Sequence, residues 1–360
     1  MAREGRAFFC GIQYHAGMKI FRGFTSLPNA CTVAIGNFDG MHLGHQALLA
    51  AVKAQAKKYD VPSAVMTFEP QPLEFFTRSE SPMRIMRLQD KALYCQQAGI
   101  DYLIVVPFTK AFAAKTPAEF IALLEQSCGA KAVVVGDDFR FGAKRAGDVE
   151  TLKQGKFELQ VIDEQTYNGE RISSTRIRQA LQDNQLDLAV ELLGHPYTLA
   201  GRVTYGNQFG RKLGFPTINI KLKPKQVEIT GIFAARVTAL SRPSPEGASR
   251  DQISDRFHAN NEGSNHWVSA QGRDRTYYGA ANLGIRPAIE GNTPWLEVNL
   301  FDFDGDLYGR RVQVELLHKL HDEKHYADMG ALKVGIAEDV KDIKAWFDDQ
   351  VKLGSMDSPR

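Results

Sequence analysis

The chain has 360 residues, 43% of them hydrophobic, which is enough for two domains with packed cores. Lys and Arg (44) nearly balance Asp and Glu (42), which argues against nucleic acid as the main partner. No apolar run approaches the roughly 18 residues needed to cross a bilayer, and the first residues are too weakly apolar for a secretory signal. The four cysteines include no Cys-x-x-Cys pair, which favours reduced thiols in a cytoplasmic protein.

From residue 31 the sequence alternates between β-branched apolar runs and helix formers, which indicates a doubly wound parallel sheet with its ligand crevice at the carboxyl ends of the strands. Residues 1–17 show no periodicity, so we expect them to be an extension. The expected strands are Cys31–Ile35, Val61–Phe68, Tyr102–Pro107, Lys131–Gly136 and Phe157–Ile162. The expected helices are 46–58, 88–98, 117–128 and 175–193, and the third begins with a Thr-Pro-Ala-Glu capping box.

The turn after the first of these strands, Gly36–His45, carries the clearest functional signal. Strand, glycine-rich turn and helix in that order place unpaired N–H groups around an anion. His42 and His45 are three residues apart, so on the first turn of a helix they share one face and can both donate to a phosphate. Two ordinary surface histidines are the alternative. We interpret this turn as a nucleotide phosphate site.

Three further loops follow strands at the same edge of the expected sheet. In Phe68–Pro72 two prolines stiffen a path against which a ring could lie, and 136–142 combines polar and aromatic residues between glycines. The third loop carries Ser174, Thr175 and Arg178 at the start of the fourth helix. Ser and Thr could simply cap that helix. A guanidinium group one turn later favours a phosphate instead.

After Gly194 the hydrophobic period changes to two, which predicts a small antiparallel β-barrel. The domain limits are therefore expected at 18–194 and 195–350. The segment 241–276 is polar and has too little apolar surface to fold alone, so we expect a mobile loop between two strands. The expected strands are Leu199–Tyr205, Gly231–Leu240, Tyr277–Leu283, Trp295–Phe303 and Val312–His318, and the last helix covers 329–348.

The barrel half contains a second glycine-rich loop, Gly206–Gly214, followed by Thr217 and Asn219. These two residues are two apart on an extended segment, so their oxygens point to the same side. Oxygen ligands suit Mg²⁺, which keeps water and nucleotide phosphates in its shell. Two strand residues facing solvent are the alternative. Glu297 lies inside an apolar run, where a carboxylate is either catalytic or held in a structural salt bridge.

A histidine cluster near the C-terminus is a weaker candidate. His318, His321 and His325 could share a helical face and bind zinc. Because no further ligand set or tetrahedral spacing accompanies them, we do not expect a metal there.

Together these motifs resemble the bacterial bifunctional riboflavin kinase/FMN adenylyltransferases (FAD synthetases) over about residues 18–350. The resemblance implies a nucleotidyltransferase-like domain and a flavokinase barrel that convert riboflavin to FMN and FMN to FAD with ATP and Mg²⁺. It implies that His42 and His45 act in adenylyl transfer, that Glu297 is the kinase base, and that the metal ligands are Thr217 and Asn219. The ATP-binding positions implied are Gly36, Asn37, Phe38, Asp39, Gly40, Ser174, Thr175, Arg178, Gly206, Gly210, Lys212 and Gly214. The flavin-binding positions implied are Pro70, Pro72, Asp138, Arg286 and Arg310.

The chain departs from the family pattern in the unusual 241–276 insertion and in three shorter places. Gln208 and Phe209 stand where many relatives have a glycine in the kinase loop. Ala288 replaces a usual threonine, and His321 stands where an arginine is common near the flavin.

The chemistry agrees with this division into two sites. The phosphate of FMN is already anionic, so adenylyl transfer needs charge stabilisation of the leaving pyrophosphate and no general base. The hydroxyl of riboflavin is neutral and benefits from a base. The alternatives are an enzyme with one activity, a regulatory flavin-binding protein, or a nucleic-acid-binding protein, which the balanced charge disfavours. We expect riboflavin, FMN and ATP as partners of a monomer or weak oligomer, without nucleic acid or membrane.

Overall fold

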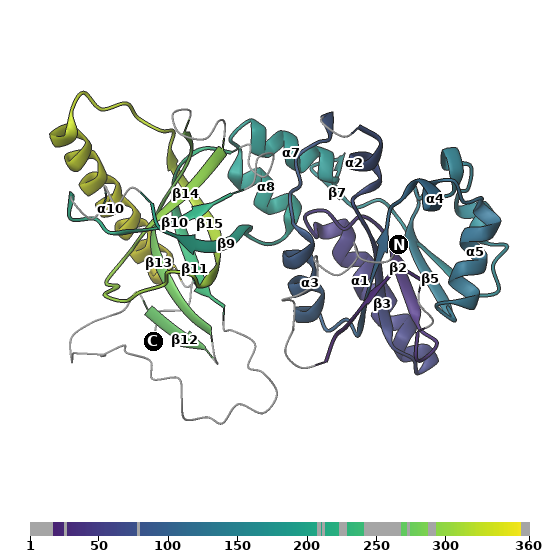
Figure 1. The fold of residues 1–360 in the computed structure, drawn as a ribbon. Helices are drawn as coiled ribbons and strands as arrows, with labels where there is room; N and C mark the ends of the chain where they lie inside the picture. The colour runs from purple at the N-terminus through teal and green to yellow at the C-terminus, as the bar shows by residue number, and fades with distance from the viewer. Residues whose placement is uncertain are drawn as a thin grey trace, which may run out of the picture. The chain divides into compact units, whose positions relative to one another are not determined.

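The computed structural model describes residues 17–24, 27–77, 80–206, 210, 213–222, 229–240, 268–271, 274–286 and 293–353. Packing divides the chain into two compact units, both drawn in Figure 1. The N-terminal unit comprises Met1–Ile177 with Leu192–Gly194, and the C-terminal unit comprises Arg178–Glu191 with His195–Arg360. The expected limits 18–194 and 195–350 stay a prediction. The expected extension 1–17 lies outside the described residues, apart from Gly17.

The N-terminal unit is built on a six-stranded sheet in the order β1-β4-β3-β2-β5-β6. All neighbouring strands are parallel, which confirms the expected doubly wound sheet. The strands are β1 (Lys19–Arg22), β2 (Thr32–Ile35), β3 (Ser63–Glu69), β4 (Tyr102–Pro107), β5 (Ala132–Gly136) and β6 (Glu158–Ile162). The sequence did not predict β1, because this short edge strand with a charge at each end has no apolar run.

Helices cover both faces of this sheet (Figure 1). Val33 and Ile35 of β2 pack in one apolar cluster with residues of α5, whereas Ala34 between them packs with α1 and α3, as alternating strand side chains require. The helices are α1 (Leu43–Tyr59), α2 (Pro72–Thr77), α3 (Leu88–Gln97), α4 (Lys110–Ala113), α5 (Pro117–Gln126) and α6 (Val149–Leu152). A 3-10 turn (Ala143–Arg145) and the hairpin β7 (Thr166–Tyr167) and β8 (Glu170–Arg171) complete the unit. The capping box of α5 is present as predicted.

The expectation of a single helix over 175–193 is wrong. The segment forms two helices, α7 (Ser174–Gln182) and α8 (Leu186–Leu193). Asn184 between them has a positive φ of 58°, a conformation that asparagine tolerates better than most residues. Its side-chain oxygen accepts a hydrogen bond from the backbone N–H of Thr230 (3.1 Å), so a tertiary contact favours the break.

The C-terminal unit is a closed antiparallel barrel, as predicted. It has six strands, and one of them, β10, was not among the five expected. The strand order is β11-β15-β9-β10-β14-β13, and pairing of β11 with β13 closes the barrel. The strands are β9 (Tyr197–Thr204), β10 (Thr217–Lys221), β11 (Gly231–Ala239), β13 (Asp274–Arg286), β14 (Thr293–Leu300) and β15 (Arg311–His321). The terminal helix α10 (Met329–Lys352) packs Ile343 and Phe347 against barrel residues, including Tyr278 and Phe301.

Two further expectations for this unit need correction. The strand β12 (Val268–Gln271) pairs with the start of β13, so part of the expected loop 241–276 is a β-hairpin. Residues 241–267 and 272–273 of that loop lie outside the described residues. His318 and His321 lie on β15, so they do not share a helical face with His325. Within the described ranges no group of three metal-ligating side chains occurs, and no helix is long and apolar enough to span a bilayer.

Candidate active sites

The loop from Gly36 to His42 joins β2 to α1, and we call it the β2–α1 loop. His42 is the N-cap residue of α1, with extended backbone (φ −61°, ψ 170°), and its side chain makes no capping hydrogen bond. The first turn of α1 also has no acidic residue. The N–H groups at the start of α1 therefore have no side-chain acceptor from the cap, which suits an anionic ligand.

The two histidines of the motif lie together. Their rings stack with centroids 3.7 Å apart, and the Phe38 ring lies 5.1 Å from that of His45. Gly44 permits this packing, because a Cβ atom there would lie 3.3 Å from the His42 ring. Burial lowers the pKa of His45 well below its ordinary value, and the charges of His42 and Lys91 lower it further. His45 is therefore neutral at pH 7 and can offer a hydrogen bond but no positive charge.

These histidines line a cavity of about 660 Å³ in the N-terminal unit. Seven residues predicted from the sequence line it: Gly36, Asn37, His42, His45, Pro72, Asp138 and Ser174. Phe38 and Asp39 are buried instead, and the Asp39 carboxylate accepts a hydrogen bond from the Met86 N–H (3.0 Å). Pro70 and Thr175 are exposed and are not among the lining residues.

Seven phenylalanines line the cavity and form what we call its aromatic wall, most of which was not predicted from the sequence. Phe68, Phe76, Phe108, Phe112, Phe120, Phe139 and Phe141 line the cavity, and each contacts at least one other aromatic ring. Phe108 directly follows β4, so the end of a fourth strand at the same sheet edge was an available signal. Such a wall suits a planar, largely apolar ring system.

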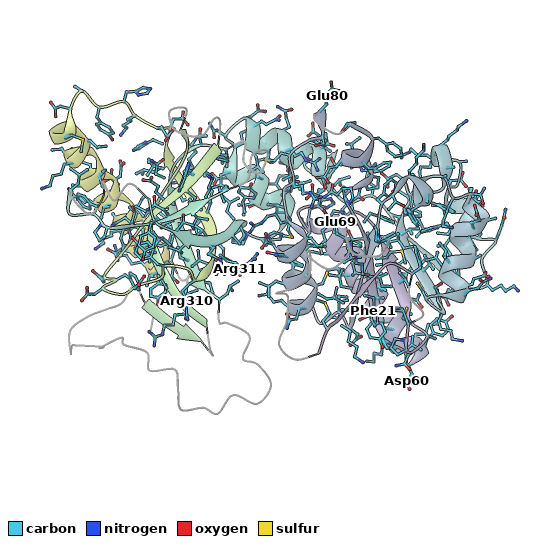
Figure 2. The ribbon with its side chains drawn as sticks, in the orientation of Figure 1. Phe21, Asp60, Glu69, Glu80, Arg310 and Arg311 are labelled. Carbon is cyan, nitrogen blue, oxygen red and sulfur yellow. The ribbon has the colours of Figure 1, made fainter. Side chains whose placement is uncertain are left out.

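One arginine ties the exposed helix α2 to the sheet. Arg84 donates to both carboxylate oxygens of Glu69 at the end of β3 (2.7 and 3.0 Å), and Glu69 is labelled in Figure 2. It also donates to Glu74 on α2. The same helix carries Leu73 and Phe76, whose exposed fractions are 51% and 66%. Arg84 therefore fixes the helix that supplies the outer part of the aromatic wall.

In the third predicted loop, Ser173 caps the helix and the predicted residue Ser174 lines the cavity. Ser173 accepts a hydrogen bond from the Arg176 N–H (3.2 Å), the pattern of a helix cap. Ser174 is thereby released from capping, and its hydroxyl donates to the backbone carbonyl of Asp39 (2.8 Å). Arg178 is half-buried and belongs by packing to the C-terminal unit. Asp138 pairs with Arg171 at the rim of the cavity.

In the barrel, three polar residues stand side by side on adjacent strands. Asn219 on β10 faces Glu297 on β14, and Glu297 faces Asn282 on β13. Directly opposed residues of an antiparallel pair lie on the same face of the sheet. The Asn219 amide lies 3.5 Å from the Thr217 hydroxyl, so these two side chains do point to one side. The sequence reasoning missed Asn282, whose buried side-chain oxygen has no hydrogen-bond partner among the described residues.

The glycine-rich loop beside these residues is only partly described. A Cβ atom at Gly206 would lie 2.3 Å from the side-chain oxygen of Asn219, so any larger residue there would displace the Asn219 side chain. A Cβ atom at Gly210 would lie 2.4 Å from the carbonyl oxygen of Phe215, and Gly214 has a φ of 90°. Arg310 is half-buried and precedes β15 (Figure 2). Lys212 and the side chain of Arg286 lie outside the described residues.

Comparison with known proteins assigns each unit to a protein family. A family model described as FAD synthetase matches residues 25–176, and one described as riboflavin kinase matches 193–347. The bifunctional riboflavin kinase/FMN adenylyltransferase of Escherichia coli K12 is 39% identical over 340 residues, covering 92% of this chain and 98% of its own. The chain belongs to this bifunctional family. A second family member, from Haemophilus influenzae, is 37% identical over 92% of this chain and 99% of its own.

A solved structure supports the fold. The Streptococcus pneumoniae protein titled a macrolide-efflux protein has a TM-score of 0.72 and 26% identity. The match covers 91% of this chain and 99% of that one. Both catalytic domains of the bifunctional family are thus present in this chain.

Proposed function

We propose that the chain divides FAD synthesis between its two units, with adenylyl transfer in the N-terminal cavity and riboflavin phosphorylation in the barrel. The chain is a riboflavin kinase and an FMN adenylyltransferase, with ATP as co-substrate of both steps. The observation that carries the division is the N-terminal cavity, which is lined both by a stacked histidine pair at a helix start and by seven phenylalanines.

In the adenylyl transfer step, a phosphate oxygen of FMN attacks the α-phosphorus of ATP, and the bond to pyrophosphate breaks. We assign His42, His45 and the first N–H groups of α1 to hydrogen bonding with the ATP phosphates, which is support by donors rather than by a base. The neutral state of His45 fits a donor role. Three further ATP positions proposed for this step, Gly36, Asn37 and Ser174, line the cavity. The assignment of Phe38, Asp39, Gly40, Thr175 and Arg178 to ATP rests on the resemblance alone.

The aromatic wall is the proposed place of the flavin ring in this step. Pro72 and Asp138 line the same cavity as the phenylalanines, which supports their assignment to FMN. Pro70 is exposed two residues before Pro72, so its assignment rests on the resemblance alone.

In the kinase step, the terminal hydroxyl of riboflavin attacks the γ-phosphorus of ATP, and ADP leaves. We propose that Glu297 accepts the hydroxyl proton, because it lies in a row of polar groups on the barrel wall. The proposed ATP positions are Gly206, Gly210, Lys212 and Gly214, and the proposed flavin positions are Arg286 and Arg310.

Mg²⁺ fits this site by the chemistry of the donors. Thr217 and Asn219 offer hard oxygen ligands on one side of β10, and Gly206 adds no side chain over the Asn219 amide. We propose that these two residues hold the ion. When bound, Mg²⁺ neutralises negative charge that develops on the phosphates during transfer.

A single time course tests the proposal. The chain is incubated with riboflavin, ATP and Mg²⁺, and the flavins are separated by chromatography. FMN followed by FAD is the expected result, and omission of Mg²⁺ should stop FMN formation. Formation of FMN without FAD would show that the chain is only a kinase. Unchanged riboflavin would show that it binds flavin without turnover.

We also propose that the enzyme is a cytoplasmic monomer or weak oligomer without a nucleic-acid or membrane partner. The balanced charge supports the absence of a polyanionic partner. The buried, free thiols of Cys31, Cys95 and Cys128 fit a reducing compartment. Light scattering of the purified chain measures the oligomeric state.

A further inference from the structure

Lys91 on α3 is a buried lysine that the mechanism above does not use. Its exposed fraction is 2%, and it does not line the cavity. Buried lysines are rare without a paired or hydrogen-bonded ammonium group. The Lys91 ammonium donates to the backbone carbonyl of Asn37 and to the hydroxyl of Thr67 (3.1 Å). The Thr67 hydroxyl in turn donates to the same Asn37 carbonyl (3.2 Å).

These hydrogen bonds meet a backbone segment that needs external support. Phe38 and Met41 of the β2–α1 loop have positive φ angles of 50° and 48°, a conformation that is unfavourable for residues other than glycine. Such residues persist only where the surroundings hold them. Lys91 and Thr67 hold the loop directly before Phe38, and the Gln46 side-chain amide donates to the Met41 carbonyl (3.0 Å).

The direction of the Asn37 carbonyl also orients the next peptide N–H. In a trans peptide the C=O and the following N–H point in opposite directions. Hydrogen bonding of the Asn37 carbonyl to Lys91 therefore turns the Phe38 N–H away from Lys91. The same residue, Asn37, lines the cavity, as does His42.

We propose that Lys91 is a positioning residue for adenylyl transfer, which fixes the β2–α1 loop through the Asn37 carbonyl and so aligns the loop with the phosphates of ATP. The inference rests on the proposed use of His42 and His45 in that reaction. Electrostatic interactions also link Lys91 to Asp39 of the same loop and to His45. Burial lowers the pKa of Lys91, while the charges of Asp39 and Glu69 act in the opposite direction. The charge of Lys91 also contributes to the lowered pKa of His45.

The test is the variant Lys91→Met in the full chain, because methionine fills similar space and removes the donor. Misplacement of a catalytic group by about 1 Å typically costs about 10²-fold in rate, so kcat for FAD formation from FMN and ATP should fall by about that factor. The KM for ATP should change far less, because Lys91 does not line the cavity. Formation of FMN from riboflavin should proceed at the parent rate.

Lys53→Met is the matched control. The Lys53 ammonium also donates to a backbone carbonyl, that of Ala98 (2.7 Å), but it is exposed and lies outside the cavity. Both activities should survive in this variant. Hydrogen–deuterium exchange of residues 36–42 supplies a readout independent of catalysis, and it should accelerate in Lys91→Met and not in Lys53→Met.

If Lys91→Met fails to fold, Thr67→Val tests the same contact with an isosteric change. Loss of one neutral hydrogen bond to the Asn37 carbonyl should slow adenylyl transfer about fivefold. Parent rates and unchanged loop exchange in folded Lys91→Met, or in Thr67→Val if Lys91→Met does not fold, would overturn the role of Lys91. An equal loss of both activities would also overturn it. The assignment of His42 and His45 is tested separately by their own variants, so a failure of the Lys91 role can be distinguished from a failure of that assignment.

Discussion

Asn219 on β10 stands directly opposite Glu297 on β14 in an antiparallel pair, so the proposed metal ligand and the proposed base lie on one face of the barrel wall. The next strand adds Asn282 opposite Glu297. Glu297 therefore has an asparagine directly opposite it on each of the two neighbouring strands. This arrangement supports a catalytic role for Glu297.

Glu297→Gln tests that role. The change keeps the size and hydrogen bonding of the side chain and removes its ability to accept a proton. Loss of a general base typically slows a reaction about 10²–10⁴-fold, so FMN formation should fall by that order, as measured in single-turnover kinase assays. Binding of ATP with Mg²⁺ should change little, because Thr217 and Asn219 are intact. A melting temperature that falls in step with the rate would favour the structural role.

A glycine supplies a second test of the barrel site. Gly206→Ala places a Cβ atom where the side-chain oxygen of Asn219 lies 2.3 Å away, so Asn219 must move. A displacement of about 1 Å should lower the kinase rate about 10²-fold. Adenylyl transfer from ATP to supplied FMN is the internal control and should keep its rate. A kinase rate equal to that of the parent would show that Asn219 does not act in the kinase step.

The double change His42→Ala with His45→Ala tests the N-terminal cavity. Removal of donors aimed at developing charge commonly costs about 10²–10³-fold, so FAD formation should fall at least that far while FMN formation continues. Chromatography of flavins over time distinguishes the two steps. If both rates fell together in a folded protein, the division of the reactions between two units would be wrong.

Local patterns predicted the elements and much of the cavity. The β2–α1 loop and the Thr116 capping box were readable, because each depends on neighbours in sequence. The break at Asn184 was not, since it is favoured by a tertiary hydrogen bond to Thr230. The strand β1 is stabilised by pairing with β4, and its own sequence has no hydrophobic pattern that predicts a strand.

The site residues that the sequence did not predict also depend on tertiary contacts. From the sequence, Lys91 is expected to be an exposed lysine on a helix. It is buried only because α3 packs against the β2–α1 loop. Asn282 gains its place through strand register, which a single sequence does not give. The phenylalanines read as core residues, and the structure shows that they also line a cavity.

Arg84→Met should loosen the helix that carries Leu73 and Phe76. The bonds to Glu69 and Glu74 are lost, so α2 no longer covers the proposed flavin position. We expect the KM for FMN in adenylyl transfer to rise about tenfold, the equivalent of about 1.4 kcal/mol in binding. The control is Arg87→Met. Arg87 also forms an ion pair, with Asp90, but this pair lies at the start of α3 and does not involve α2. An unchanged KM for FMN would show that α2 does not contact the flavin.

The buried state of His45 predicts how stability depends on pH. Its pKa in the folded state lies well below the ordinary 6.5, so between these two values the unfolded chain binds a proton that the folded chain does not. The contribution of the neutral, buried ring is therefore fully present above pH 6.5 and is lost as the pH falls towards the folded pKa. In His45→Gln, which removes the titrating group, the free energy of unfolding should decline less steeply between pH about 6.5 and about 5. Urea unfolding of both proteins across this range measures the difference. Parallel declines in parent and variant would mean that His45 is not held neutral by the fold.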